Sequence, residues 1–416
     1  IWPSSIPCKI ENEDSIRLAD YGTSNSGLLK TLYRSGLSYR YGSMMQTVSG
    51  IHYNFSFSDA FFESLRGEED LQTFKNKSYL SLIRNFRRNA WMILYLFGSS
   101  PVVPKTFITD RQNFLQELNK EDLFLEYATC LRMSELGYMS KAQDNLYIAY
   151  NNIEEYLKDL KNALTKEHKR YGEVGVIKDG KRIQINTSII QIENEYYSSI
   201  RPKRVTPPGE RPINVLRNEG IDYVEIRALD NNSFLPSGID EDTSYFLEAY
   251  LIGCFFGEDK KSTQDEIKEL LVNWENVVKK GRDPNLKLLR NNKKISLKKT
   301  GMEVIDSLRS IFEQMPDGMS PYVNKVFKSL DKQEKKFMDS SLTPSGKILD
   351  ELKNNKTWEE LNLELFNNHS KVLRDKNLDL GYLNEEAKNS IDKFKKLEEI
   401  DEIRFDEYLD KFIKDI

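Results

Sequence analysis

The stretch Tyr223-Val-Glu-Ile-Arg-Ala-Leu-Asp230 predicts a β-strand whose two faces differ in chemistry. Glu225 and Arg227 lie on one face and alternate with Val224 and Ile226 on the other, the period of two expected of a strand. A solvent-exposed strand often alternates in this way, but lysine and threonine, which are common on such faces, are absent from this row. We therefore interpret the polar face as a candidate binding surface, with a solvated strand face as the alternative.

Two other segments show the same alternation of polar and apolar residues. His52 and Asn54 share a polar face within residues 51–57, and Glu193 lies on the polar face of residues 188–196. Each segment is predicted to be a strand. Together the three strands predict a sheet face lined with carboxylates, an arginine, an imidazole and amides.

Helical periodicity occupies much of the remaining sequence. One long helix is expected over residues 71–97, and the residues after 301 are predicted to be helical. Residues 281–300 are basic, break the regular pattern and are predicted to be a linker or loop. We expect an α+β fold in which residues 1–280 form a catalytic sheet-and-helix region, and residues 301–416 form a helical region packed on the same domain.

Composition excludes several classes of protein. The 416 residues carry a net charge of −4, which argues against a nucleic-acid partner. The longest apolar run, Ala90 to Phe97, is far shorter than the roughly 20 residues that span a bilayer, so we expect no membrane segment. Cys8, Cys130 and Cys254 lack the short spacing of a zinc or dithiol motif and indicate a reducing compartment, so we expect a cytoplasmic protein.

The residue types on the polar faces suit metal and phosphate chemistry. Magnesium takes carboxylate oxygens together with phosphate oxygens and water, and arginine offers phosphate a planar set of donors with a permanent charge. No G-x-x-x-x-G-K-[ST], G-x-G-x-x-G, H-E-x-x-H or G-x-S-x-G motif occurs in the chain. The residues alone therefore indicate an enzyme that binds a metal and a phosphorylated substrate without a Walker loop.

Longer motifs follow one another over residues 1–280. They are Trp2-Pro-Ser-Ser-Ile-Pro-Cys8, Tyr21-Gly-Thr-Ser-Asn-Ser-Gly27, Lys30-Thr-Leu-Tyr-Arg-Ser-Gly36, Met45-Gln-Thr-Val-Ser-Gly-Ile-His-Tyr-Asn-Phe-Ser56, Leu131-Arg-Met-Ser-Glu-Leu-Gly-Tyr138, Gln191-Ile-Glu-Asn-Glu195, Ile200-Arg-Pro-Lys-Arg204 and Tyr223 to Asp230. In this order they resemble the glutamate–cysteine ligases of the proteobacterial type. The combination is specific because no single generic motif carries it, whereas the C-terminal helices resemble the family only loosely.

The resemblance implies a fold and a reaction. The fold would be similar to the catalytic domain of glutamine synthetase, a curved antiparallel sheet that forms a funnel with helices outside. ATP, as co-substrate with Mg²⁺ or Mn²⁺, would phosphorylate the γ-carboxylate of L-glutamate, and the amine of L-cysteine would displace the phosphate. This is the first step of glutathione biosynthesis, so glutathione is a candidate feedback inhibitor. We also expect a monomer.

The resemblance also assigns roles to residues of this chain. It places Glu225 among the magnesium ligands and Arg227 beside the transferring phosphoryl group. The other assignments are Tyr33, His52 and Tyr138 in the cysteine pocket, Gln46 and Arg132 near glutamate, Asn54 beside His52 on the strand, and Glu193, Asn194, Tyr197 and Lys203 on the nucleotide side. Without the resemblance, a structural histidine, core tyrosines and a solvated basic turn at residues 201–204 are the alternatives.

One departure concerns the start of the chain at Ile1. In the family that the chain resembles, an earlier strand with a Glu-x-Glu pair and an acidic stretch supply most of the remaining magnesium carboxylates. We therefore expect a fragment with an incomplete metal site and an open strand edge. Two alternatives remain open: another carboxylate–amine ligase of the same fold, and a relative that has lost catalysis.

Overall fold

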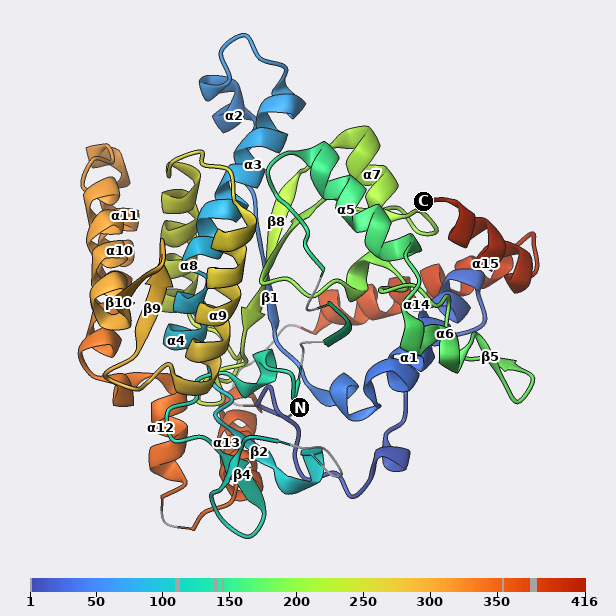
Figure 1. The fold of residues 1–416 in the computed structure, drawn as a ribbon, viewed down its shortest axis with the longest axis horizontal. Coiled ribbons are helices and arrows are strands. Elements are labelled where there is room, and N and C mark those ends of the chain that lie inside the picture. Colours follow the sequence, from blue (N-terminus) through green and yellow to red (C-terminus); the bar gives the residue numbers. More distant parts are fainter. Residues whose placement is uncertain (1, 109–112, 138–140, 144–145, 354, 375–379) are drawn as a thin grey trace.

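A three-stranded antiparallel sheet lies at the centre of the computed structural model, which describes residues 2–416 except 109–112, 138–140, 144–145, 354 and 375–379 (Figure 1). Its strands are β1 (Ile51–Phe55), β8 (Tyr223–Leu229) and β7 (Ile200–Lys203), in that spatial order. The strands predicted at residues 51–57 and 221–230 are therefore confirmed. They are distant in sequence, so the sheet brings remote parts of the chain together.

The register of this sheet aligns polar residues from all three strands. Asn54 of β1 lies opposite Glu225 of β8, and Glu225 lies opposite Arg201 of β7. Residues that lie directly opposite one another in an antiparallel pair point to the same face. The register shifts between Ile51 and Tyr53, an irregularity that surrounds His52.

The apolar face of the sheet packs on helices. Val224, Ile226 and Ile200 are fully buried and belong to one large core with residues of α3 (Leu71–Arg88) and α4 (Trp91–Phe97). The single long helix predicted over residues 71–97 is wrong in detail. The backbone leaves the helical region at Asn89 (φ −124°, ψ 21°), so the chain turns between α3 and α4.

The other helices of the first 280 residues surround the sheet. They are α1 (Asn25–Tyr41), α2 (Asp59–Leu65), α5 (Ile153–Thr165), α6 (Lys169–Val174), α7 (Pro212–Glu219), α8 (Glu241–Phe255) and α9 (Gln264–Lys280). In Figure 1, α3, α4, α8 and α9 lie on one side of the sheet, and α1, α5 and α6 lie on the other. The sheet therefore lies between two groups of helices.

The remaining sheets are small. β2 (Val102–Pro104), β4 (Asp122–Phe124) and β3 (Gln116–Glu117) form one, β5 (Ile177–Lys178) pairs with β6 (Lys181–Arg182), and β9 (Lys287–Arg290) pairs with β10 (Lys293–Ser296). The hairpin β9–β10 occupies the segment predicted to be a linker or loop, with Asn291 and Asn292 at positive φ in its turn. An α+β fold with small antiparallel sheets is thus confirmed, whereas the curved funnel is not.

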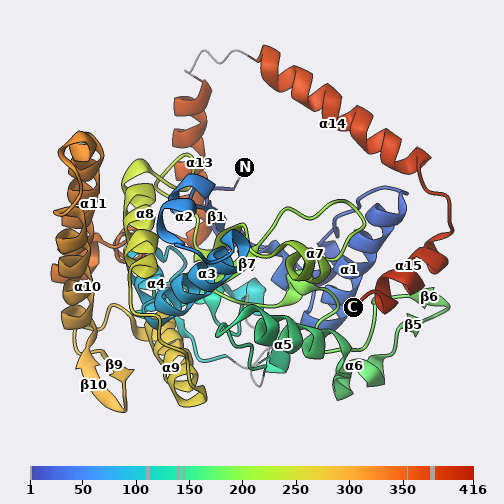
Figure 2. The same ribbon diagram turned by 90° about the horizontal axis from the view of Figure 1, so that it is seen from above.

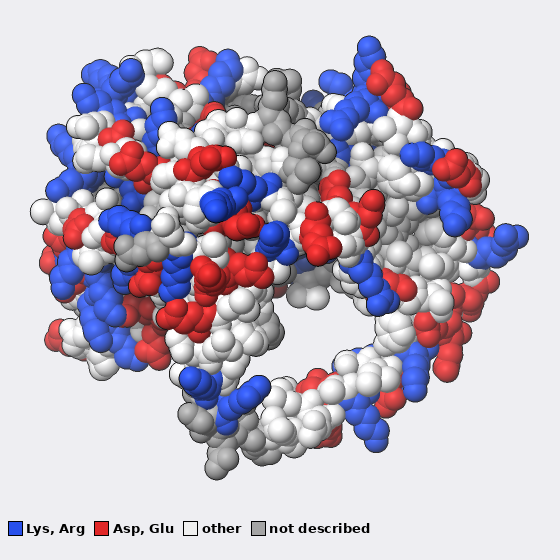
Figure 3. All heavy atoms as spheres, turned by 90° about the horizontal axis from the view of Figure 1, so that it is seen from below, with Lys and Arg blue, Asp and Glu red and all other residues white. Residues whose placement is uncertain are grey.

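Helices continue to the C-terminus: α10 (Leu297–Phe312), α11 (Ser320–Met338), α12 (Pro344–Glu351), α13 (Trp358–Arg374), α14 (Gly381–Glu399) and α15 (Phe405–Lys414). α10 and α11 pack beside α8, and Trp358 of α13 is fully buried. α14 instead runs apart from the rest of the molecule and leads to α15, which lies against α1 (Figure 2). The space-filling view shows an opening beside this connection (Figure 3). Within the described residues, no helix is both long enough and apolar enough to cross a membrane.

Candidate active site

The polar face of the central sheet brings three of the predicted site residues together. The carboxylate of Glu225 lies 3.6 Å from His52 Nδ1 through Oε2 and 3.6 Å from Arg227 Nε through Oε1. Arg227 Nε also donates to His52 Nε2 (3.4 Å), and its Nη1 donates to the carbonyl oxygen of Tyr196 (3.4 Å). Asn54, which is exposed, lies opposite Glu225 in the register. The sequence therefore predicted the centre of this cluster correctly in space.

Neighbouring charges keep Glu225 ionised. Burial alone would raise the pKa of this carboxyl group, but the hydrogen bond from His52 and the positive charges of Lys203 and Arg227 lower the pKa to about 2. The surroundings of Lys203, by contrast, disfavour its charged form. Burial and the nearby guanidinium groups of Arg201 and Arg227 lower the pKa of Lys203, while Glu225 opposes the shift.

Arg201 also belongs to this face, so the alternative of a solvated basic turn at residues 201–204 does not hold for it. It is only 4% exposed and lies opposite Glu225. Its Nη1 and Nη2 donate to the carbonyl oxygens of Glu193 (3.4 Å) and Asn194 (3.2 Å), while its buried Nε has no hydrogen-bond partner among the described residues. The alternation of Arg201 and Lys203 with Ile200 and a proline was a weak strand signal that could have revealed this position.

The described strands therefore place more positive than negative charge on this face. Arg201, Lys203 and Arg227 surround one carboxylate, an arrangement that attracts phosphate or carboxylate groups of a ligand. No group of three or more His, Cys, Asp or Glu side chains in the described part of the chain is placed to bind a metal. The ionised Glu225 nevertheless fits one ligand of a divalent cation whose other ligands are phosphate oxygens and water.

The segment predicted as a strand over residues 188–196 is not a strand. Residues Glu193–Glu195 form a 3-10 turn, and we call residues 193–196 the arginine-held turn. Glu193 forms a bidentate ion pair with Arg211 (3.0 and 3.1 Å), and Glu195 pairs with Arg40 (3.1 Å). The prediction failed because these carboxylates find buried guanidinium partners from distant segments, which periodicity does not reveal.

The predicted nucleotide residues therefore occupy two adjacent elements. Asn194 is exposed on the arginine-held turn. Tyr197 directly follows this turn, and the backbone amide of Tyr197 donates to Gln143 Oε1 (3.0 Å). Lys203 lies on β7 beside Glu225. Glu193 is buried and its carboxylate is engaged by Arg211, so the side chain supports the turn.

The residues predicted to bind glutamate and cysteine lie in several places. Tyr33 is on α1 and is partly buried against α15, while the Nε2 of Gln46 donates to Arg34 O and Ser38 Oγ of α1 (both 2.9 Å). Arg132 is buried beneath the end of β8, where its Nε contacts Asp230 Oδ1 at 2.6 Å. Tyr138 lies outside the described residues. These roles in substrate binding remain predictions.

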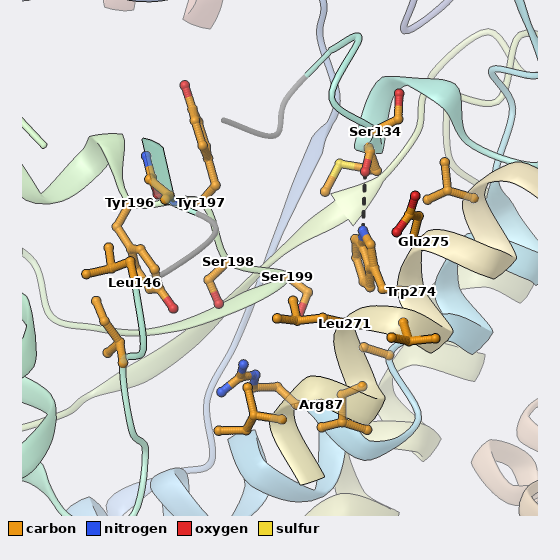
Figure 4. A pocket seen from close by; sticks show the side chains of 18 of the residues that line it. Arg87, Ser134, Leu146, Tyr196, Tyr197, Ser198, Ser199, Leu271, Trp274 and Glu275 are labelled. Atoms are coloured by element: carbon orange, nitrogen blue, oxygen red, sulfur yellow. Dashed lines mark hydrogen bonds between the residues drawn. The ribbon is translucent and has the colours of Figure 1, made fainter. Parts of the chain in front are cut away.

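A cavity of about 470 Å³ adjoins the arginine-held turn (Figure 4). Tyr196, Tyr197, Ser198 and Ser199 line one side, and Trp274 of α9 lies across from them, where its Nε1 donates to Met133 O (3.2 Å). Arg227 reaches the same wall, since its amide donates to Ser199 O (2.9 Å) and its side chain to Tyr196 O. The cavity is therefore adjacent to the charged face and large enough for a small organic substrate.

A sheet face with clustered cations around one ionised carboxylate is typical of enzymes that act on phosphorylated substrates. The model of the glutamate-cysteine ligase family matches residues 1–277. The glutamate–cysteine ligases of Pseudomonas putida and Pseudomonas entomophila are 45% and 42% identical to the chain, over 84% and 91% of it and 67% and 72% of their own lengths. The chain belongs to the glutamate–cysteine ligase family.

A solved structure agrees with this assignment. The structure of the glutamate–cysteine ligase from Francisella tularensis in complex with AMP is 37% identical to the chain and superimposes with a TM-score of 0.91. The match covers 99% of this chain and 82% of that one, so it includes the C-terminal helices that resembled the family only loosely by sequence.

Proposed function

We propose that this chain joins the γ-carboxylate of L-glutamate to the amine of L-cysteine in a reaction driven by ATP. The observation that carries the proposal is the cluster of Glu225, His52 and Arg227 on one sheet face, in a chain of the glutamate–cysteine ligase family. The family name gives the two amino acids, and the AMP complex of the Francisella relative supports an adenine nucleotide as the third substrate.

The first step must bring two anions together. A γ-carboxylate oxygen of glutamate attacks the γ-phosphorus of ATP, the bond from that phosphorus to the bridging oxygen breaks, and ADP leaves. Arg227 and Lys203 reduce the repulsion between carboxylate and phosphate. Arg227 is suited to this role because its guanidinium keeps its charge and is held by the carbonyl of Tyr196.

The second step forms the amide. The neutral amine of cysteine adds to the acyl carbon, the bond to the phosphate oxygen breaks, and the amine loses a proton as phosphate leaves. Water would compete for the acyl phosphate, so the site must exclude it. We propose that Tyr33, His52 and Tyr138 line the cysteine site, with Asn54 beside His52, and that Gln46 and Arg132 lie near glutamate. We also propose that Asn194, Tyr197 and Lys203 border the nucleotide and that Glu193 acts there through the turn that it holds.

Magnesium or manganese, when bound, would neutralise charge on the nucleotide phosphates. Glu225 is the described side chain best suited to hold it, because a carboxyl group with a pKa of about 2 is ionised at every physiological pH. We also propose that the polar face of β1–β8–β7 forms part of a funnel wall. The chain is further proposed to act as a cytoplasmic monomer that glutathione inhibits.

The test is to measure ADP formation with magnesium, ATP and L-glutamate, with and without L-cysteine. The proposal predicts cysteine-dependent ADP release and formation of γ-glutamylcysteine, with Arg227→Ala as the inactive control. Equal turnover with glycine or ammonia would favour another carboxylate–amine ligase. Binding of AMP without any turnover would favour a relative that has lost catalysis.

A further inference from the structure

Arginine side chains hold the arginine-held turn from two sides. Arg201 binds the carbonyl oxygens of Glu193 and Asn194 from the sheet side. Arg211, at the start of α7, binds both carboxylate oxygens of Glu193, and this pair is almost completely buried, with side chains 1% and 6% exposed. A buried bidentate pair fixes both position and orientation. The turn is therefore held both by the sheet, through Arg201, and by the start of α7, through Arg211.

The side chain of Arg211 also contacts the C-terminal helix α15. Arg211 Nη1 donates to the carbonyl oxygen of Phe412 in α15 (3.0 Å), and the Arg211 guanidinium stacks 4.4 Å from the centre of the Phe412 ring. Asn214 of α7 adds a hydrogen bond to the carbonyl oxygen of Asp415 (3.1 Å). One guanidinium thus connects α15 with the carboxylate of Glu193.

The apolar face of α15 contacts a second element with a predicted substrate residue. Leu409 is fully buried in a small core with Leu32 of α1 and Ile185. Tyr33 of α1 and Ile192, which directly precedes the arginine-held turn, pack against the same core. α15 therefore contacts the helix that carries Tyr33, and it shares a core with Ile192, the residue directly before the arginine-held turn.

α14 leads to α15 and is exposed along most of its length. No residue of α14 is buried, and Figure 2 shows this helix spanning from α13 towards α15 away from the body. Near its end, Glu398 accepts hydrogen bonds from the amide and hydroxyl of Thr23 (3.1 and 2.6 Å). Between α14 and α15, Asn25 holds the chain, since its amide donates to Asp401 Oδ2 (2.5 Å) and its Nδ2 donates to the carbonyl oxygen of Ile403 (2.9 Å). These bonds to the start of α1, together with the contacts of α15 with α1 and Arg211, set the position of α15.

We infer that α15 is a positioning element for the active site, and that Arg211 transmits its position to the arginine-held turn. The inference deepens the proposed function, because it assumes that this turn borders the nucleotide. Docked α15 keeps the turn closed against the sheet and keeps α1 in place. When α15 is undocked, the Arg211 side chain that pairs with Glu193 is less constrained, so the turn loosens and nucleotide binding weakens.

The test compares Arg211→Lys with Arg217→Lys in the full chain. Lysine keeps the charge at 211 but loses the bidentate pair and the stacking. Arg217 is a matched control on the same helix, exposed and bonded to Asn214. Hydrogen exchange is followed at the amides of Glu195 and Tyr196, whose hydrogen bonds close the turn. AMP binding is measured by calorimetry, and KM for ATP by ADP release.

Arg211→Lys is expected to speed exchange at these two amides at least tenfold and to weaken AMP binding about tenfold, with Arg217→Lys unchanged. A purely structural role would reduce the folded fraction but leave the AMP affinity of folded molecules unaltered. Leu409→Ala, which loosens α15 without touching Arg211, is expected to produce the same two changes. It also serves as the test variant if Arg211→Lys does not fold.

Two results would overturn the inference. One is exchange at Glu195 and Tyr196 within twofold of the control in both variants. The other is faster exchange with unchanged AMP affinity and unchanged KM, which would mean that the turn does not serve the nucleotide. A wild-type chain that binds AMP but forms no amide would instead count against the proposed function, and the exchange measurement would remain decisive for α15.

Discussion

Replacing Glu225 by glutamine is expected to lower both the stability and the activity of this chain. The carboxylate is 12% exposed and faces His52, Arg227 and Lys203, which together hold its pKa near 2. The difference from the ordinary value of 4.5 corresponds to about 3 kcal/mol of favourable interaction with the charged form, and this is an upper limit for the loss. Glutamine can keep some hydrogen bonds, so a loss of about 1–3 kcal/mol at pH 7 is expected.

The pH dependence of this loss has a definite sign. Because the pKa of Glu225 is lower in the folded state than its ordinary value, the stabilisation is complete above about pH 4.5 and disappears as the pH falls through about 2. Urea unfolding of wild type and Glu225→Gln should therefore differ most at neutral pH and converge in acid. The kcat should fall by about 100-fold or more, since the variant changes the charge beside the transferring phosphoryl group.

Glu219→Gln is the matched control for this experiment. Glu219 is 58% exposed and lies 3.4 Å from Arg204, so its replacement should change the free energy of unfolding by less than about 0.5 kcal/mol and leave kcat unaltered. The reasoning is refuted if Glu225→Gln unfolds at the same urea concentration as the control at neutral pH. It is equally refuted if its kcat equals that of the control.

Three further substitutions test other parts of the site and fold. Arg227→Lys should lower kcat about 100-fold with little change in unfolding, because an ammonium cannot contact both His52 and the Tyr196 carbonyl; a kcat near wild type would exclude a role at the phosphoryl group. Asp230→Asn should destabilise the chain by about 3 kcal/mol in urea, because it leaves the buried Arg132 without its charged partner; a change within about 0.5 kcal/mol would contradict this. Lys336→Met should raise Tm at pH 6, because it removes a cation whose pKa is lowered by burial from 10.5 to about 7. The gain in Tm should shrink as the pH rises towards 10.5, and a gain independent of pH would show that Lys336 does not titrate as described.

The central sheet could be predicted from sequence because its strands follow a simple period. Alternation placed Glu225 and Arg227 on one face, and the structure confirms that face together with His52. Alternation in residues 188–196 was misleading. There the carboxylates of Glu193 and Glu195 pair with arginines that are distant in sequence, and a local pattern carries no information about such partners.

For Arg201, the alternation of residues 200–203 gave only a weak strand signal. Four residues with three cations resemble a solvated turn, and only pairing with β8 reveals that Arg201 is buried opposite Glu225. The position of α15 in the fold was equally impossible to predict. The sequence predicts a helix there, but its contacts with α1 and Arg211 join segments that are distant in sequence.

The most direct test of the proposed reaction follows oxygen from glutamate to phosphate. The chain is incubated with magnesium, ATP, L-cysteine and L-glutamate labelled with ¹⁸O in the γ-carboxylate, and the products are analysed by mass spectrometry. An acyl phosphate predicts ADP as the nucleotide product and one ¹⁸O atom in each phosphate released. Formation of AMP with pyrophosphate, or phosphate without label, would contradict the mechanism proposed for this site.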